Sequence, residues 1–387
     1  MTCTAEALDG VIAMLANGTG PVALDAERAS GFRYGQRAQL VQLFRRQAGI
    51  ALIDPTVLPD LSGLSQALEG AEWVLHAASQ DLACLAELGL VPKQLFDTEL
   101  ASRLLGDALV GLATVVGRTL GISLAKEHSA QDWSQRPLPD GWLNYAALDV
   151  ALLIDVRDHL EVELRAAGKL ELAREEFKAV LLAPPPAPRP DPWRRTKGSH
   201  QIRDRRGFAI VRELWQARED LARQLDLAPG RVLPDAAIVA VALAKPESQS
   251  QLDRIAPFNG RNLRRRQRYW WRAVDRALQI PVGSLPPMQG PRQPGPPNPR
   301  AWPRHHPQAS QRLEMVKAEL ARLSQDKSIP VEHLAPPDLL RQVVFAAPSD
   351  PAAALRAGRA RDWQVKLVAP IVAKAMTTYP EASASGQ

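Results

Sequence analysis

The sequence predicts a mixed α/β domain followed by all-α domains. Three observations lead to this fold class. Strand-like and helix-like segments alternate in the first half of the chain, helical periodicity dominates the second half, and two proline-rich stretches separate the parts. Alternating strands and helices are typical of an α/β domain, whereas successive amphipathic helices are typical of an all-α domain. The 387 residues are enough for two or three domains of ordinary size.

Four short apolar segments predict the strands of the first domain. Each is rich in β-branched or other apolar residues and is bounded by polar residues or proline. We expect these strands at residues 22–25, 38–44, 49–53 and 73–76. Helical periodicity predicts helices at residues 61–68 and 143–160 of the same domain, and at 211–225 and 264–278 of the second half.

Two proline-rich stretches mark the linkers. The first covers residues 183–192, and the second has ten prolines between residues 281 and 307. Proline lacks a backbone N–H, so neither stretch can continue a helix or form a central strand. We therefore predict an α/β domain at 1–182, a linker at 183–204, a helical domain at 205–280, a linker at 281–307 and a second helical domain at 308–380.

A faint internal repeat connects the two helical domains. A Leu-Ala-Arg segment, a proline and a Pro-Asp pair occur in this order at residues 221–235, and again about 100 residues later at 320–338. Two copies of one small helical module would produce this pattern. A chance match is the alternative, because the second copy is poorly matched.

Charge is divided unequally along the chain. Residues 1–187 hold 15 Lys and Arg against 24 Asp and Glu, whereas residues 188–387 hold 33 against 18. A basic half beside an acidic half predicts that the second half holds a polyanion such as a nucleic acid. The alternative is a basic protein whose charge serves only solubility.

Several classes of protein are excluded by what the sequence lacks. The two cysteines, Cys3 and Cys84, cannot form a disulfide framework or a zinc cluster. No apolar run approaches the roughly 20 residues of a membrane helix, and no secretory signal is visible, so a cytoplasmic location without membrane contact is expected. No Gly-x-x-x-x-Gly-Lys-Ser/Thr loop is present, which argues against a helicase.

Acidic residues in three places are candidates for a shared metal site. Asp25 and Glu27 are two apart on a predicted strand, so their side chains point to the same face. Asp81 follows the strand predicted at 73–76, and Tyr145 and Asp149 are four apart on one face of a predicted helix. Taken separately, Asp25 and Glu27 could lie in a surface turn, and Asp81 could lie in the first turn of a helix, where negative charge suits the helix dipole. Asp149 lies on an otherwise apolar helix face, where a buried carboxylate is costly unless it is paired or binds a metal.

A cluster of these carboxylates would need cations. Like charges about 4 Å apart repel by roughly 4 kcal/mol at an effective dielectric constant of about 20. Divalent cations would neutralise the cluster, and ligands that are all oxygen favour Mg²⁺ or Mn²⁺ over zinc. Two such ions about 4 Å apart are a common arrangement for phosphodiester hydrolysis.

These motifs resemble those of the DEDDy 3′→5′ exonucleases, and among them the ribonuclease D family. The resemblance rests on the Asp-x-Glu at Asp25, on Asp81 after a fourth strand, and on the Tyr-x-x-x-Asp at Tyr145. The matching linking segments are residues 74–81, 95–101 and 132–138. The basic segment around residues 231–235 is similar to the helicase-and-ribonuclease-D C-terminal (HRDC) domain. The second helical domain is similar to a degenerate HRDC copy.

The resemblance implies a fold and an activity. The fold would be ribonuclease H-like, with a mixed sheet whose second strand is antiparallel. The activity would be stepwise 3′→5′ hydrolysis of RNA to nucleoside 5′-monophosphates with two divalent ions, Mg²⁺ or Mn²⁺. Family relatives trim 3′ extensions of transfer RNA precursors and other stable RNAs, and the family suggests a monomer.

The resemblance also implies roles for single residues. Asp25, Glu27, Asp81 and Asp149 would be the metal ligands, with Asp25 bridging the two ions. Tyr145 would hydrogen-bond the attacking water. The sequence departs from the family pattern at two positions. Ala26 stands where a hydroxyl residue is common, and Arg28 stands where an apolar or aromatic residue is common; both departures concern contacts with substrate.

Basic and aromatic residues are the candidates for binding RNA. Arginine grips phosphates through a planar fork, and aromatic rings can stack on bases. The candidates are Arg33, Tyr34, Lys126, Arg136, Arg264, Arg265 and Arg268. The alternative for the last three is a solvated helix face. Two other functions stay open: a DEDDy exonuclease acting on DNA in repair, and a non-catalytic RNA-binding protein.

Overall fold

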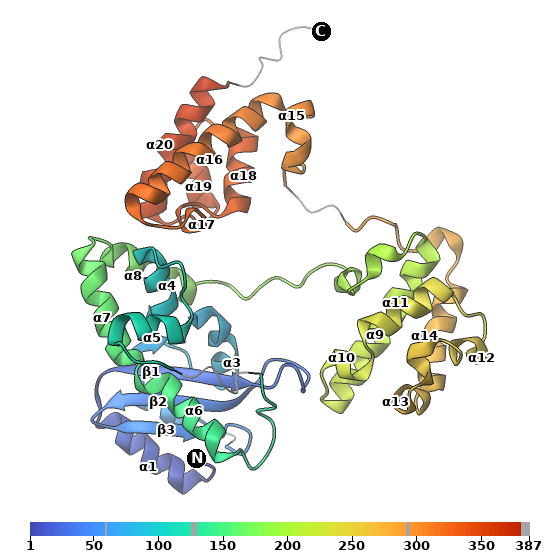
Figure 1. The fold of residues 1–387 in the computed structure, drawn as a ribbon, viewed down its shortest axis with the longest axis horizontal. Helices are drawn as coiled ribbons and strands as arrows, with labels where there is room; N and C mark the ends of the chain where they lie inside the picture. Colours follow the sequence, from blue (N-terminus) through green and yellow to red (C-terminus); the bar gives the residue numbers. More distant parts are fainter. Residues whose placement is uncertain (59, 125–129, 292–294, 381–387) are drawn as a thin grey trace.

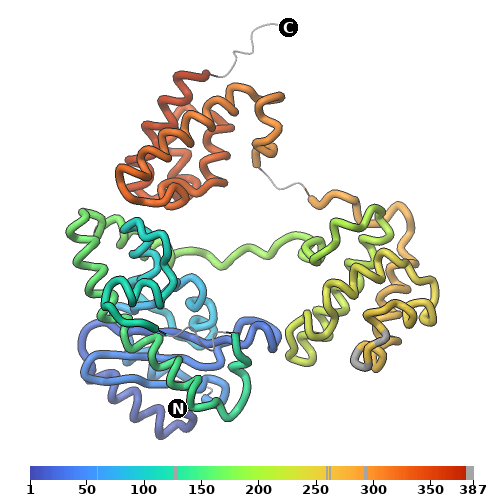
Figure 2. The backbone as a smooth tube through the Cα atoms, in the orientation of Figure 1, coloured from blue at the N-terminus to red at the C-terminus, as the bar shows by residue number. Residues whose placement is uncertain are grey.

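A computed structural model describes residues 1–58, 60–124, 130–291 and 295–380. The chain forms three bodies (Figure 1), which we call the sheet body (residues 1–181), the first helical body (192–285) and the second helical body (299–379). The backbone trace passes from the sheet body to the first helical body and then to the second (Figure 2). Among the helices of the described ranges, none is long and apolar enough to cross a bilayer.

The sheet body contains a five-stranded mixed sheet. The strands are β1 (Thr19–Arg28), β2 (Ala38–Arg46), β3 (Gly49–Ile53), β4 (Glu72–Leu75) and β5 (Gln94–Asp97), in the order β3-β2-β1-β4-β5. β2 is antiparallel to both of its neighbours, whereas β1, β4 and β5 are parallel. The expected mixed sheet with an antiparallel second strand is therefore confirmed. β5 was not predicted as a strand, because its four residues are too few to show a period.

Eight α-helices surround this sheet. They are α1 (Ala5–Ala16), α2 (Ser62–Ala67), α3 (Leu82–Glu87), α4 (Thr98–Leu105), α5 (Leu112–Leu120), α6 (Asp140–Ala151), α7 (Leu153–Ala166) and α8 (Leu170–Leu181). The single helix predicted at 143–160 is two helices, since the chain breaks at Leu152. The break lets α6 pack against β1, β2 and β3 while α7 packs against β1 and β4 (Figure 1).

The two helical bodies share a series of three helices. The first helical body contains α9 (Arg205–Leu225), α10 (Pro229–Val232), α11 (Asp235–Ala244), α12 (Gln249–Leu252), α13 (Arg261–Arg264) and α14 (Gln267–Gln279). The second contains α15 (Trp302–His305), α16 (Pro307–Lys327), α17 (Val331–Leu334), α18 (Pro337–Ala346), α19 (Pro351–Ala357) and α20 (Asp362–Thr378). α9–α11 and α16–α18 both have lengths of 21, 4 and 10 residues. The sequence repeat thus coincides with a repeat of helices.

The second helical body packs directly on the sheet body. One cluster of buried apolar side chains runs through both, and a separate cluster forms the core of the first helical body. Buried Glu176 of α8 accepts hydrogen bonds from the Arg361 guanidinium and from Trp363 Nε1. Lys169 Nζ donates to the backbone oxygen of Ser328 at 3.1 Å. Because the Glu176 carboxylate is buried and its partners are on α20 and just before it, these polar contacts help to fix the orientation of the second helical body.

The first helical body contacts the sheet body through the segment that follows β1. The backbone N–H of Ala228 donates to the oxygen of Phe32 at 2.9 Å. Arg231 donates to the oxygen of Gly31 at 2.9 Å, and its guanidinium lies 4.1 Å from the centre of the Phe32 ring. The connection between β1 and β2 therefore carries the contact between these two bodies. The same strand β1 carries Asp25 and Glu27.

Candidate active site

β1 presents Asp25 and Glu27 on the face of the sheet that α6 covers. Leu40 is the cross-strand partner of Glu27, and it packs with Ala146 of α6 in a small apolar cluster. α6 thereby brings Asp149 over the strand. One carboxylate oxygen of each of Asp25, Glu27 and Asp149 lies within 4.8 Å of the other two. We call these three residues the carboxylate trio.

α6 also places Tyr145 beside the trio. Tyr145 and Asp149 are one helical turn apart, and the phenol hydroxyl hydrogen-bonds the Asp149 carboxylate. Burial and the neighbouring carboxylates raise the pKa of Tyr145 above its usual value. The hydroxyl therefore keeps its proton at neutral pH and can serve as a hydrogen-bond donor, not as a base.

Asp81 is not one of the residues whose carboxylate oxygens lie within 4.8 Å of one another. It follows β4 and the 3₁₀ turn Ala78–Gln80, and its side chain is 7% exposed. Arg28 Nη2 lies 3.1 Å from Asp81 Oδ1, and Arg28 Nη1 donates to the oxygen of Gln80 at 2.9 Å. Arg28 therefore forms an ion pair with Asp81, the carboxylate that the family resemblance implies as a metal ligand.

Asp97, at the end of β5, holds the turn that leads to Asp81. Its buried carboxylate accepts from the backbone N–H groups of Ala77 and Ala78 at 3.1 and 2.9 Å. It also accepts from Glu99 and Leu100 in the first turn of α4. Ala77 has φ of 60°, a left-handed conformation that a non-glycine residue adopts at a cost. Asp97 therefore stabilises an unusual turn directly before a predicted ligand.

The acidic side chains of the site are difficult to ionise together. Burial is the main cause, followed for three of them by repulsion from Asp25. The pKa of Glu27 is raised to about 9, and the pKa values of Asp81 and Asp149 are each raised to about 7. The pKa of Asp25 is itself raised, chiefly by burial. A cation would reverse these shifts because it favours the charged form of every carboxylate.

The trio fits a divalent cation by the chemistry of its donors. All three ligand atoms are carboxylate oxygens, the ligands that Mg²⁺ and Mn²⁺ prefer. Gln42 is the cross-strand partner of Asp25, so both side chains point to the same face. The Gln42 side chain is fully buried, and within the described ranges neither its Oε1 nor its Nε2 has a hydrogen-bond partner. Orphaned polar atoms beside Asp25 suit a hydrated ion.

Two residues predicted to bind RNA lie where the first helical body meets the sheet body. Arg33 Nε donates to Ser134 Oγ at 2.8 Å, and its Nη1 lies 3.5 Å from Asp226. Arg223 Nη2 donates to the Tyr34 hydroxyl at 3.1 Å. The structure therefore gives Arg33 and Tyr34 partners within the protein.

Arg136 is built into the sheet body. Its guanidinium binds the buried Asp54 carboxylate through Nε and Nη2. The remaining N–H groups donate to the backbone oxygens of Gln39, Trp133 and Gln135. All five guanidinium N–H groups are thus used, so Arg136 holds its own turn against β2 and β3. This leaves no donor for an RNA phosphate.

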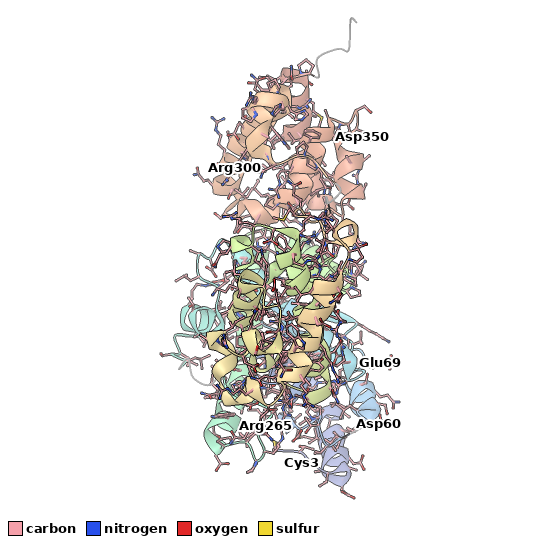
Figure 3. The ribbon with its side chains drawn as sticks, turned by 90° about the vertical axis from the view of Figure 1, so that its right-hand side faces the viewer. Cys3, Asp60, Glu69, Arg265, Arg300 and Asp350 are labelled. Carbon is pink, nitrogen blue, oxygen red and sulfur yellow. The ribbon has the colours of Figure 1, made fainter. Side chains whose placement is uncertain are left out.

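The other predicted RNA-binding residues have different surroundings. Lys126 lies outside the described residues. Arg264, Arg265 and Arg268 are exposed at the end of the first helical body, where Figure 3 labels Arg265. Trp270 of α14 is fully buried in the core of that body. The arginines therefore face solvent while the aromatic ring packs inward.

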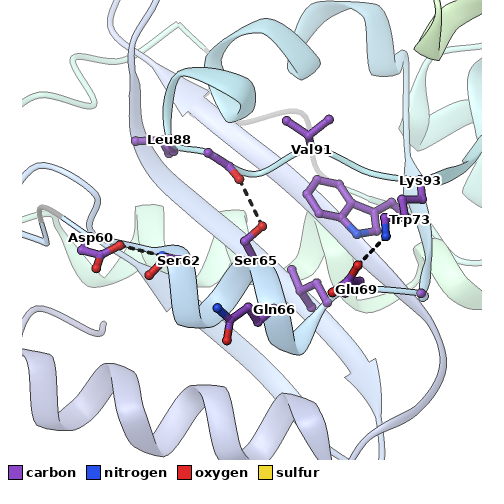
Figure 4. Close-up of a pocket in the computed structure, with 12 residues that line it drawn as sticks. Asp60, Ser62, Ser65, Gln66, Glu69, Trp73, Leu88, Val91 and Lys93 are labelled. Atoms are coloured by element: carbon purple, nitrogen blue, oxygen red, sulfur yellow. Dashed lines mark hydrogen bonds and ion pairs between the residues drawn. The ribbon is translucent and has the colours of Figure 1, made fainter.

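A separate pocket of about 410 Å³ lies between α2 and residues 88–93 (Figure 4). Trp73, near the start of β4, forms part of its wall, and a Glu69–Lys93 ion pair lies at its edge. Asp81 follows the opposite end of β4. The pocket contains no residue of the carboxylate trio, so it is not part of the candidate active site.

The mixed sheet and the carboxylate trio define a class of protein, the 3′→5′ exonucleases. A family model described as "3'-5' exonuclease" matches residues 1–165. Models described as "HRDC domain" and "3' to 5' exonuclease C-terminal domain" match residues 207–274 and 295–376.

Similarity to individual proteins indicates one family within the 3′→5′ exonucleases. Ribonuclease D of Escherichia coli is 32% identical over 270 residues, which are 68% of this chain and 71% of that protein. Ribonuclease D of Cronobacter turicensis is 29% identical over 70% of this chain and 75% of its own length. The crystal structure of E. coli RNase D has a TM-score of 0.69 and 27% identity, covering 98% of this chain and 99% of that one. A protein from Bifidobacterium adolescentis has a TM-score of 0.89 and 39% identity, covering 97% and 96%.

The chain therefore belongs to the ribonuclease D family. It is a hydrolytic 3′→5′ exoribonuclease. The carboxylate trio is its candidate site for a divalent metal ion.

Proposed function

We propose that this exoribonuclease trims the 3′ ends of transfer RNA precursors and other structured RNAs, releasing nucleoside 5′-monophosphates. The observation that carries the chemistry is the carboxylate trio, with its three oxygens within 4.8 Å of one another. The choice of substrate is supported by the similar E. coli RNase D, whose structure is described as that of an exoribonuclease involved in structured RNA processing.

In this proposal two divalent ions, Mg²⁺ or Mn²⁺, are held by four carboxylates. Asp25, Glu27, Asp149 and Asp81 would hold these ions through their carboxylate oxygens. Bound divalent ions supply a water of lowered pKa and neutralise charge at the scissile phosphate. Support for the ligand set comes from the trio and from the position of Asp81 beside the same strand.

The protein's own side chains then orient the reactants. The Tyr145 hydroxyl keeps its proton and donates a hydrogen bond, which would orient the attacking water. Its partner Asp149 fixes the direction of the phenol ring. Hydrolysis proceeds one nucleotide at a time from the 3′ end, because the substrate enters the site by its terminus.

Digestion of matched substrates tests the proposal. A 3′-extended transfer RNA precursor, an unstructured RNA and a DNA strand of equal length are incubated with Mg²⁺, with Mn²⁺ and with a chelator. We expect nucleoside 5′-monophosphates from both RNAs, trimming of the precursor to its mature end, and no product with the chelator. Preferred cleavage of DNA would favour a repair exonuclease, and binding without products would favour a non-catalytic RNA-binding protein.

We also propose that Arg264, Arg265 and Arg268 bind RNA phosphates. Replacing all three with Gln should weaken RNA binding and reduce the slope of log affinity against log salt by about 2, since each lost phosphate contact lowers the slope by about 0.7 for a single strand. Filter binding over a range of salt concentrations measures this. The matched control replaces Arg322, Arg356 and Arg359, three exposed arginines of the second helical body. Equal slopes for both triple variants would show that only total charge matters.

The domain boundaries are part of the proposal. We propose a nuclease domain at 1–182, an HRDC domain at 205–280 and a second, HRDC-like domain at 308–380, joined by linkers at 183–204 and 281–307. The equal lengths of the helices in α9–α11 and in α16–α18 support the relation between the two helical domains. We propose that the protein acts as a monomer.

A further inference from the structure

Arg28 is a cation placed directly inside the acidic site. It follows Glu27 on β1, the strand that also carries Asp25. Its guanidinium lies 3.1 Å from Asp81 and acts electrostatically on Asp25 and Glu27 as well. The chain therefore carries a positive charge among the acidic side chains of this site.

The ion pair between Arg28 and Asp81 makes the two expected cation positions, at the trio and at Asp81, unequal. The oxygens of the trio already lie together, so they can receive one cation without rearrangement. Asp81 is buried, and one of its oxygens is paired with Arg28. A divalent ion on Asp81 would stand next to the guanidinium, and the two positive charges would repel. The second ion can bind well only if Arg28 leaves Asp81.

The geometry also provides a way for Arg28 to leave. Its side chain is 24% exposed, whereas that of Asp81 is 7% exposed, so the guanidinium is the more accessible partner of the ion pair. A phosphate of the RNA backbone is an anion that a guanidinium binds through two parallel hydrogen bonds. An RNA end entering the site would therefore compete with Asp81 for Arg28.

We propose that Arg28 is a positioning residue that keeps the second cation site closed until RNA is bound. It pairs with Asp81 in the free enzyme and with an RNA phosphate in the complex, which releases Asp81 to ligate metal. The enzyme then loads its second ion only together with substrate. This inference rests on the proposed two-ion function.

Manganese binding to the full-length protein tests the inference. Titration with Mn²⁺ alone, followed by calorimetry and electron paramagnetic resonance, gives the number of ions and their affinities. We expect one tight and one weak ion in the wild type. Arg28→Gln should bind the second ion at least tenfold more tightly, and Arg28→Lys should resemble the wild type because it keeps the charge. The control is Arg37→Gln, which changes an exposed arginine in the connection between β1 and β2. This variant should leave both affinities unchanged.

A kinetic measurement separates this role from a merely structural one. In Arg28→Gln we expect half-maximal activity at a lower Mn²⁺ concentration but a higher KM for RNA, because the phosphate contact is lost. Equal affinity for the second ion in the wild type and in Arg28→Gln, with circular dichroism showing both folded, would overturn the proposal while leaving the two-ion function intact. Failure of the wild type and of Arg28→Gln to bind any Mn²⁺ would overturn both.

Discussion

Replacement of Asp25 with Asn should lower the rate of RNA hydrolysis by about a thousandfold or more while the protein stays folded. Asp25 is the residue that the other carboxylates share. Its charge raises the pKa values of Glu27, Asp81 and Asp149, so it lies close enough to act on all three. A cation that neutralises the cluster is therefore expected to interact with Asp25.

The same substitution should not harm the metal-free fold. Asp25 is buried with its pKa raised, so its ionised form is costly, and a neutral amide removes that cost. The measurement is kcat on a 3′-extended RNA with Mg²⁺, together with thermal unfolding in a chelator. Asp140→Asn, at the exposed start of α6, is the matched control and should keep normal activity. Activity of Asp25→Asn within tenfold of the wild type would remove Asp25 from the mechanism.

Local periodicity was sufficient to relate two pairs of residues within the site. A strand period of two predicts that Asp25 and Glu27 share a face, and a helix period near four predicts that Tyr145 and Asp149 share one. Both relations depend only on residues that are close in the sequence, and both are present in the structure. Which face of the sheet α6 would cover depends on the packing of Leu40 against Ala146, which the sequence alone does not reveal.

Residues that act through distant contacts escaped sequence reasoning. Gln42 lies in an apolar run and gave no sign of its position opposite Asp25, because strand register is a property of two segments. Asp97 was noticed only as part of a family segment, since its four backbone partners come from two different turns. A polar residue at the centre of a predicted buried strand is the signal that could have drawn attention to Gln42.

Arginines were the least predictable residues. Arg28, Arg33 and Arg136 look alike in the sequence, but the structure pairs them with Asp81, Asp226 and Asp54, respectively. A long flexible side chain can reach partners from any element within several ångströms, so its role is set by the tertiary fold. Among the described arginines that the sequence predicts to bind RNA, Arg264, Arg265 and Arg268 have exposed surroundings that suit this contact.

The stability of the metal-free protein should fall as pH rises toward 9, and Mg²⁺ should abolish this fall. The folded pKa values of Asp81 and Asp149, each about 7, and of Glu27, about 9, lie above the usual values of 3.8 and 4.5. The unfolded chain therefore releases these protons at lower pH than the folded chain does. Their contribution to stability is complete below about pH 4 and is lost as pH rises through 7 to 9.

Other groups limit the useful range of pH. Buried His76 has its pKa lowered to about 4, so protonation of the unfolded chain destabilises the fold as pH falls below its usual value of 6.5. The range from pH 6.5 to 9 therefore excludes the titration of His76. Thermal unfolding is measured across this range with a chelator and with Mg²⁺ in excess.

Metal binding opposes the fall because it requires the ionised carboxylates. Bound ions stabilise the folded state by about 2.7 kcal/mol when the free ion is at about 100 times its Kd. This corresponds to a rise in Tm of roughly 5–10 °C. The rise should be larger at pH 8.5 than at pH 6.5, because at the lower pH the ion must first displace protons. Asp149→Asn should show a weaker dependence on pH and a smaller rise. A metal-free Tm that is constant from pH 6.5 to 9 would mean that these carboxylates are neither buried nor close together in solution.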